Sequence, residues 1–150
     1  MIHIQKILCP VDFSAPSRNA LRYANEFAKA MNAKITVLHV IQPQPIVADV
    51  NVPYVPLEVE LEKSAKEDLE RIVKEDVQEG VLVEQVLAFG MPSDCVIAQA
   101  RKENVDLIIL GTHGRTGISR LLMGSTTESV IRHAARPVLV VKAEEKEFIS

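Results

Sequence analysis

The sequence predicts an α/β fold, with an open and mainly parallel five-stranded sheet that carries helices on both faces, of the Rossmann-like kind. One observation is a series of short, continuous apolar segments, which are typical of strands buried on both faces. A second is the helical periodicity of the apolar residues between these segments. Because strands that alternate with helices pair in parallel through right-handed crossovers, the two observations together predict a doubly wound sheet.

The first strand is predicted at 6–12, "KILCPVD", a short apolar segment that ends in an acid. A helix should follow from Ser14 to Met31, where apolar residues recur three or four positions apart. Ser14 is the expected N-cap, and Pro16 is tolerated in the first helical turn. The second strand is predicted at 34–40, which is rich in β-branched residues.

A long loop is predicted at 41–56, because this segment carries four of the eight prolines. Proline neither donates a hydrogen bond to a sheet nor fits inside a helix. A helix is predicted over 57–79, with Gly80 as the glycine that stops it. The third strand is predicted at 81–88.

The alternation continues through the second half of the chain. A short helix is predicted at 91–104, and the apolar segment "DLIIL" at 106–110 is the fourth strand. A glycine-rich loop begins directly after it, at Gly111. A helix at 125–135 and a strand at 137–141 complete the predicted elements.

Length and composition indicate one globular domain over 1–150. Apolar residues make up 47% of the chain and charged residues 25%, as in ordinary globular proteins. The net charge is −3, and no basic run indicates a nucleic-acid or anionic-membrane partner. No apolar run reaches the ~18 residues of a membrane span. Asp12 closely follows the first apolar run, which argues against a signal peptide, so we expect a cytoplasmic protein.

The glycine loop lies where a ligand site is expected. In a doubly wound sheet, ligands bind beyond the carboxyl ends of the strands, where the strand order reverses. Asp12 ends the first predicted strand, and the loop from Gly111 follows the fourth. Gly111, Gly114 and Gly117 allow positive φ and a close approach of the backbone to a ligand. Amides turned inward by such a loop bind anions.

The start of the last predicted helix supplies a second set of donors. The segment "STTE", Ser125 to Glu128, fits a capping box. Gly124 and Ser125 would then lie where a helix leaves unpaired amides and a partial positive charge, so phosphate is the expected ligand. The loop is neither a Walker A motif nor a dinucleotide-binding fingerprint, because it has no lysine after a glycine and follows the fourth strand.

These segments together resemble a known family. "GTHGRTG" followed by "LLMGSTTESVI" matches the motif G-x2-G-x9-G-[ST]. With "ILCPVDFS" near the start and "ARPVLVV" near the end, nearly the whole chain resembles the universal stress protein family. The resemblance implies a five-stranded parallel α/β domain with strand order 3-2-1-4-5, often a homodimer. It also implies membership of the subgroup that binds ATP without an established enzymatic reaction, because this glycine motif marks that subgroup.

The resemblance also implies where ATP, alone or with Mg²⁺, would bind. Asp12 would meet the ribose or the adenine, and the main chains of Val11 and Val40 would contact the base. Thr126 stands where the matching segment often has an apolar residue and joins the set without an assigned role. The other expected binding residues would surround the phosphates, and they are Gly111, His113, Gly114, Gly124, Ser125 and Thr127.

Structural roles are the alternative for several of these residues. Asp12 could instead cap the helix that starts near Ser14. Ser125 and Thr127 serve the helix start in any case, because capping and phosphate binding use the same geometry. His39, in an apolar strand, is predicted to be a hydrogen-bonded core residue.

The leading functional prediction is a stress-response regulatory protein that binds ATP or another adenine nucleotide. A slow ATPase or phosphotransferase is one alternative, although Asp12 is the only convincing acid at the predicted crevice and phosphoryl transfer needs several charged groups. A dimeric interaction module that binds no nucleotide is another. No catalytic residue and no metal site are predicted, since Cys9 and Cys95 lack metal-ligand spacing and adjacent basic groups.

The last strand predicts an association with a second copy of the chain. By the family's strand order, "PVLVV" would lie at an edge of the sheet, where unpaired main-chain groups invite another strand. We therefore predict a homodimer in which Val138 to Val141 pairs antiparallel with its own copy across a two-fold axis.

Overall fold

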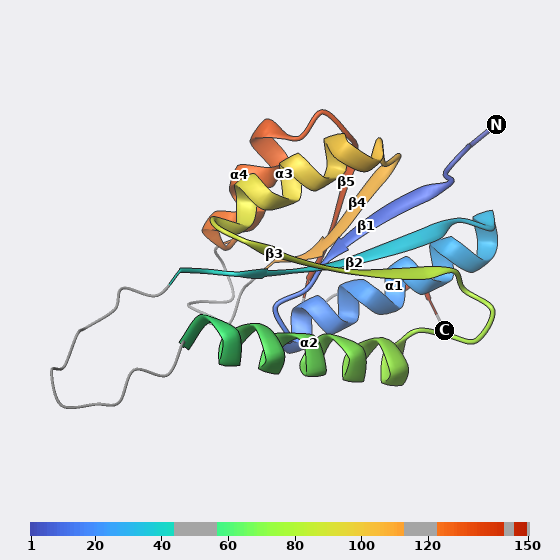
Figure 1. Cartoon of the computed structure of the whole chain (residues 1–150). Coiled ribbons are helices and arrows are strands. Elements are labelled where there is room, and N and C mark those ends of the chain that lie inside the picture. Colours follow the sequence, from blue (N-terminus) through green and yellow to red (C-terminus); the bar gives the residue numbers. More distant parts are fainter. Residues whose placement is uncertain (44–56, 113–122, 143–145, 150) are drawn as a thin grey trace, which may run out of the picture.

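The computed structural model describes residues 1–43, 57–112, 123–142 and 146–149. Within them, five parallel strands form one sheet in the order β3-β2-β1-β4-β5, which confirms the predicted fold and strand order (Figure 1). The elements are β1 (Lys6–Pro10), α1 (Ala15–Met31), β2 (Lys34–Ile41), α2 (Leu57–Asp76), β3 (Val83–Phe89), α3 (Pro92–Glu103), β4 (Leu107–Gly111), α4 (Ser125–His133) and β5 (Val138–Val141).

Helices cover both faces of the sheet. Figure 1 shows α1 and α2 on one side and α3 and α4 on the other. Each side has its own buried apolar cluster, because successive strand residues point to opposite faces. Ile7 and Cys9 of β1 pack toward α1 and α2, whereas Leu8 between them packs toward α3 and α4. Helices on both faces therefore follow from a central strand whose successive residues Ile7, Leu8 and Cys9 are all apolar.

The start of α1 confirms the predicted cap. The hydroxyl of Ser14 accepts a hydrogen bond from the amide of Ser17 at 3.4 Å, and Pro16 lies in the first turn. The helix ends at Asn32, which adopts the left-handed conformation and donates its amide to the carbonyl of Ala28. Both ends of α1 are thus satisfied by local contacts.

The predicted end of the helix over 57–79 was wrong, because α2 stops at Asp76. The side-chain amide of Asn25, buried in α1, donates to the Asp76 carbonyl at 2.8 Å. The carbonyl oxygen of the same side chain accepts from the amide of Gln78 at 3.2 Å. A contact from another helix therefore ends α2, and Gly80 lies further on, at φ +86°, in the turn before β3.

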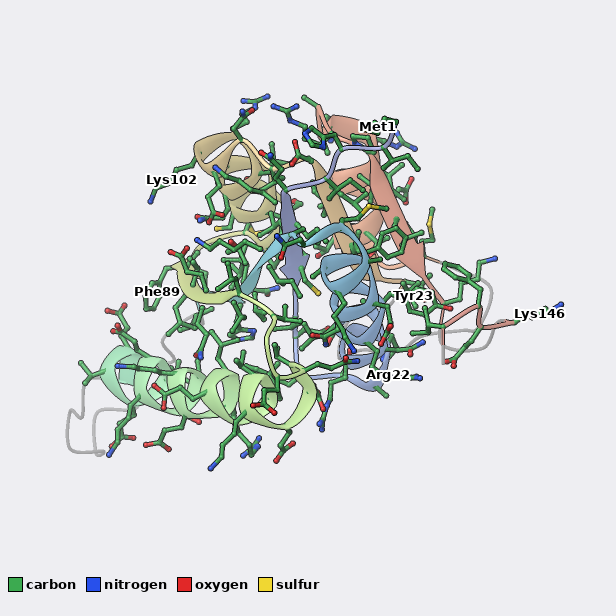
Figure 2. All side chains as sticks on the ribbon, turned by 90° about the vertical axis from the view of Figure 1, so that its right-hand side faces the viewer. Met1, Arg22, Tyr23, Phe89, Lys102 and Lys146 are labelled. Atoms are coloured by element: carbon green, nitrogen blue, oxygen red, sulfur yellow. The ribbon has the colours of Figure 1, made fainter. Side chains whose placement is uncertain are left out.

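The C-terminal residues fold back onto α1. The ring of Phe148 meets that of Tyr23 edge-on, with centroids 5.1 Å apart. Next to it, Arg22 pairs with Glu147 at 3.3 Å, and Figure 2 shows Arg22 and Tyr23 on the side of α1 where the chain ends. The predicted loop 41–56 lies outside the described residues from residue 44 onward.

The amino end of the sheet is closed by hydrogen bonds from side chains. One carboxylate oxygen of Asp106 accepts from the amides of Gln5 and Lys6, at 2.8 and 3.0 Å. The Glu103 carboxylate accepts from the Thr36 hydroxyl at 2.6 Å, and the Lys6 ammonium donates to the Glu103 carbonyl at 2.9 Å. The polar groups at this end are used to hold the fold.

Candidate functional site

A cavity of about 620 Å³ opens at the carboxyl end of the sheet. The ends of β1, β2 and β4 form its floor, and the starts of α3 and α4 and one face of α2 form its walls. The neighbouring strands β1 and β4 lead into helices on opposite faces, which makes this the point where the strand order reverses. Ligands of open α/β sheets bind at such points.

The structure brings most of the predicted binding residues together around this cavity. Two of them, His113 and Gly114, lie outside the described residues. The other predicted residues all line the cavity, and they are Val11, Asp12, Val40, Gly111, Gly124, Ser125, Thr126 and Thr127.

The start of α4 differs from the predicted capping box. Gly124 is the N-cap, with φ −61° and ψ 153°, and Ser125 is already the first helical residue. Because glycine has no side chain to accept an amide, the N-terminal amides of the helix are not capped locally. The amides of Ser125, Thr126 and Thr127 have no acceptor among the described residues. This end of α4 therefore presents donors and a partial positive charge to the cavity.

Thr127 holds α4 against the sheet. Its buried hydroxyl donates to the carbonyl of Gly111, the last residue of β4, at 2.8 Å. The amide of Gly124 donates to the carbonyl of Thr112 at 2.7 Å, a second link between the two elements. Since the hydroxyl hydrogen of Thr127 is used by the fold, the group that Thr127 can offer to a ligand is its amide.

Gly111 serves a close approach of two elements and not a positive φ. It is an ordinary strand residue, whereas the described glycines with positive φ are Gly80 and Gly90. A Cβ on Gly111 would lie 2.8 Å from the carbonyl carbon and oxygen of Pro16. The positive φ that glycine allows is not used at this position, and the glycine instead lets the first turn of α1 pack on β4.

Asp12 supports the start of α1 through Ser14, which is the N-cap of the helix in place of Asp12. Its Oδ1 accepts from the amide of Ser14 at 3.0 Å and from the Ser14 hydroxyl. Its own amide donates to the hydroxyl of Ser17 at 3.3 Å. Asp12 thus holds the start of α1 and at the same time lines the cavity.

His39 is the hydrogen-bonded core residue that the sequence predicted. Its Nδ1 lies 2.8 Å from the carbonyl oxygen of Val11, and because a carbonyl only accepts, the histidine donates. The His39 ring also packs on the ring of Phe13, with centroids 4.3 Å apart. The amide of Val11 donates to the carbonyl of Leu38 at 2.8 Å, so both main-chain polar groups of Val11 have partners within the protein.

Several cavity residues were missed in the sequence. His39 and Phe13 line the cavity, and Phe13 has a φ of +66°, which nothing in the sequence indicates for a phenylalanine. The α2 residues that line the cavity were detectable, because they recur at helical spacing on one face. They are Leu61, Ser64, Ala65 and Asp68.

Both cysteine thiols have a pKa above the ordinary value. Complete burial raises the pKa of the Cys9 thiol to about 12. Burial, and next the charge of Asp94, also raises the pKa of Cys95. The described parts of the chain contain no group of three His, Cys, Asp or Glu side chains that could hold a metal ion. In the same parts, no helix is long and apolar enough to cross a bilayer.

Comparisons with known proteins agree with this architecture. Residues 3–142 match the Universal stress protein family. Universal stress protein MJ0577 of Methanocaldococcus jannaschii is 35% identical, over 92% of this chain and 94% of the relative. The solved structure of the hypothetical protein MJ0577 superposes with a TM-score of 0.83, at 34% identity, over 97% of this chain and 100% of that one.

Two more distant structures share the fold and hold nucleotides. A universal stress protein in complex with cAMP superposes with a TM-score of 0.66, at 23% identity, over 95% of this chain and 100% of that one. The universal stress protein of Archaeoglobus fulgidus in complex with dAMP superposes with a TM-score of 0.61, also at 23% identity, with the same shares covered. At this identity the likeness supports the fold alone.

Proposed function

This chain belongs to the universal stress protein family, and we propose that it is a cytoplasmic stress-response regulator that binds ATP or a related adenine nucleotide. Residues 1–150 would act as one nucleotide-binding domain. The observation that carries the proposal is the cavity at the carboxyl end of the sheet. It joins the unpaired amides at the start of α4 to the ends of β1 and β2 in one space.

The α4 end of the cavity fits a polyphosphate. Three consecutive amides, those of Ser125, Thr126 and Thr127, have no acceptor among the residues described, and they lie at the positive end of the helix dipole. Gly124 has no side chain to cover them. Amides that donate to phosphate oxygens form charge-assisted hydrogen bonds, which are stronger than neutral ones. Gly111, His113 and Gly114 belong to the phosphate site of this proposal.

The β1 and β2 end of the cavity fits the nucleoside. Asp12 lies at the end of β1, where its carboxylate can accept from a ribose hydroxyl, and the main chains of Val11 and Val40 border the place proposed for the base. Two relatives of the same fold hold cAMP and dAMP, which supports an adenine nucleotide as the class of ligand. ATP, alone or with Mg²⁺, is the member of that class proposed here.

A regulatory role suits these groups better than catalysis. Phosphoryl transfer depends on charge neutralisation and on a residue that orients the nucleophile. Asp12 is the one acid among the predicted binding residues, and its Oδ1 is already engaged with Ser14. A slow ATPase is the alternative, and Asp12→Asn tests it. If the wild type hydrolyses ATP above background and this substitution abolishes the hydrolysis, the protein is an enzyme.

We also propose that the chain forms a homodimer through β5. This strand is at an edge of the sheet, and Val138, Leu139 and Val140 are only partly buried. Antiparallel pairing with a second copy would satisfy the main-chain groups of the edge and cover these side chains. A sizing column with light scattering should give twice the mass of the chain, and a monomer at high concentration would contradict the dimer.

The nucleotide proposal is tested by titrating ¹⁵N-labelled protein with ATP and following the backbone amide resonances. The amides of Ser125, Thr126 and Thr127 should shift most, because they gain charged acceptors. Tripolyphosphate should shift the same amides but leave Val40 unchanged, which separates the two ends of the cavity. ATP binding that leaves the three α4 amides unchanged, or no binding at millimolar ATP, would contradict the proposal.

A further inference from the structure

The ladder of main-chain hydrogen bonds between β1 and β2 lacks its last expected bond, the one next to the cavity. In register, Pro10 of β1 pairs with Leu38, and β2 runs on past this point to Ile41 (Figure 1). The amide of Val11 still donates to the Leu38 carbonyl at 2.8 Å. In a parallel ladder the next bond would run from the amide of Val40 to the carbonyl of Val11.

The direction of the Val40 peptide groups follows from the bonds of its neighbours. Lys34 and Leu38 make main-chain hydrogen bonds on the β1 side of β2, whereas Ile35 and Ile41 make theirs on the β3 side. Because this direction alternates along a strand, the N–H and C=O of Val40 both face the β1 side. Beyond the end of β1 that side is the cavity, which Val40 lines.

The expected acceptor of the Val40 amide accepts a hydrogen bond from a side chain instead. The carbonyl of Val11 accepts from Nδ1 of His39 at 2.8 Å. The His39 ring is held in place by near-complete burial, at 9% exposure, and by its contact with Phe13. Within the residues that the structure describes, the Val40 amide then has no acceptor. The hydrogen bond from His39 to the Val11 carbonyl is therefore made in place of the one from the Val40 amide.

We propose that His39 is a positioning residue for base recognition, which holds the Val11 carbonyl and so keeps the Val40 N–H and C=O open to the cavity. This inference rests on the proposed function. A donor and an acceptor side by side match adenine, whose N7 acceptor lies beside its N6 amino donor. Guanine presents two acceptors, O6 and N7, in the same places. The Val40 peptide groups would therefore favour adenine over guanine nucleotides.

The substitutions His39→Leu and His39→Asn form a matched pair. The Asn amide nitrogen occupies the position of Nδ1 and can keep the bond to the Val11 carbonyl, whereas Leu has the same shape without the donor. Both lose the ring that packs on Phe13, so a difference between them reports the hydrogen bond. In His39→Leu, the Val11 carbonyl is free to take the Val40 amide.

Hydrogen exchange and nucleotide affinity together test the inference. In the ligand-free wild type, the Val40 amide should exchange faster than that of Leu38, and His39→Leu should slow it. His39→Leu should weaken ATP binding about three- to tenfold, as the loss of a hydrogen bond would, and reduce the preference for ATP over GTP. Tripolyphosphate affinity should not change, and His39→Asn should resemble the wild type in all of these measurements.

Two results would overturn the inference. One is a Val40 amide as protected as that of Leu38 in the wild type, and the other is equal ATP affinity in the two variants. If the wild type binds neither ATP nor tripolyphosphate, the proposed function fails. In that case the exchange rates of the Val40 amide in the wild type and in His39→Leu still test, without any ligand, whether His39 keeps these groups open.

Discussion

The two ends of the sheet differ in whether their main-chain amides find acceptors within the protein. At the amino end, Asp106 binds two amides of the segment that enters β1, and Glu103 binds Thr36 and Lys6. At the carboxyl end, the first three amides of α4 and the amide of Val40 have no acceptor among the described residues. Both ends belong to the same five strands, so the fold alone does not account for the difference.

The comparison separates stability from binding. Main-chain amides that have no acceptor in the protein add nothing to its stability, whereas the hydrogen bonds at the amino end do. A ligand with suitable oxygen atoms can supply the missing acceptors at the carboxyl end. We therefore expect substitutions at the amino end to change the free energy of unfolding, and those at the carboxyl end to change ligand affinity.

Gly111 is the position at the carboxyl end where a substitution should change the free energy of unfolding most. It lies at the carboxyl end, but a Cβ there would come within 2.8 Å of the main chain of Pro16. Because backbone atoms cannot turn aside, Gly111→Ala should lower the free energy of unfolding by about 3 kcal/mol, at the upper end for overpacking. Denaturant unfolding followed by circular dichroism measures this.

Gly80→Ala is the control for Gly111→Ala. A Cβ on Gly80 would meet no atom within 4 Å, but the backbone there has a φ of +86°. The substitution should therefore cost only about 1 kcal/mol, from the left-handed backbone. Equal losses in the two variants would mean that the close approach of α1 to β4 is not the reason for a glycine at 111.

Asp106→Ala should have the next largest effect and should act on stability alone. Removal of the acceptor for two amides should cost about 1–2 kcal/mol of unfolding free energy, as for hydrogen bonds to a charged group that is partly exposed. Affinity for ATP should be unchanged, because Asp106 is at the far end of the strands. Weaker ATP binding in the folded variant would contradict the separation of the two ends.

The contribution of Asp106 should also depend on pH. The hydrogen bond from the Gln5 amide lowers the pKa of Asp106 below its ordinary value of 3.8, and the Lys6 amide and the charge of Arg136 act in the same direction against partial burial. A carboxyl with a lowered folded pKa stabilises above its unfolded pKa and loses this effect as pH falls through the folded one. The stability difference between wild type and Asp106→Ala should therefore be constant above about pH 5 and shrink below about pH 3.8. A constant difference down to pH 2 would contradict this.

Arg18→Met should have the smallest effect. Both oxygens of Asp76 accept from the Arg18 guanidinium, at 2.6 and 2.7 Å, but the arginine side chain is 41% exposed. Exposed ion pairs contribute less than about 1 kcal/mol, so urea unfolding should show a loss in that range. A loss above 2 kcal/mol would mean that ion pairs between α1 and α2 matter more than the hydrogen bonds at the ends of the sheet.

Local sequence information was enough for the elements and for the place of the cavity, and the resemblance to a family supplied most of the individual residues that line it. Continuous apolar strands and helical periodicity predicted each element within a few residues of its observed bounds, and spacing at the strand ends brought Asp12 and Ser125 to one cavity. What the sequence did not reveal depends on contacts between distant residues. Asn25 ends α2 from another helix, and Pro16 requires the glycine at 111.

The capping box at the start of α4 failed for a different reason. The sequence "STTE" suits a helix that begins one residue later, with Ser125 outside it. In the structure, the amide of Glu128 donates to the carbonyl of Gly124 at 3.0 Å, so the helix begins at Ser125 with Gly124 as its cap. The Glu128 carboxylate pairs with Arg132 instead of reaching back to Ser125, and the amides of the first turn are left without a local acceptor beside the cavity.

The most direct test of phosphate binding by these amides compares the ATP affinity of Ser125→Pro with that of Ser125→Ala. Proline removes the amide hydrogen, yet it is tolerated at the first helical position, and Gly124 already has the extended backbone that precedes a proline. Alanine removes only the hydroxyl. Calorimetry should show ATP binding weakened about ten- to hundredfold in Ser125→Pro, the value of a hydrogen bond to a charged group, and within about threefold of wild type in Ser125→Ala. Equal affinities in the two folded variants would contradict the claim that the α4 amides hold the phosphates.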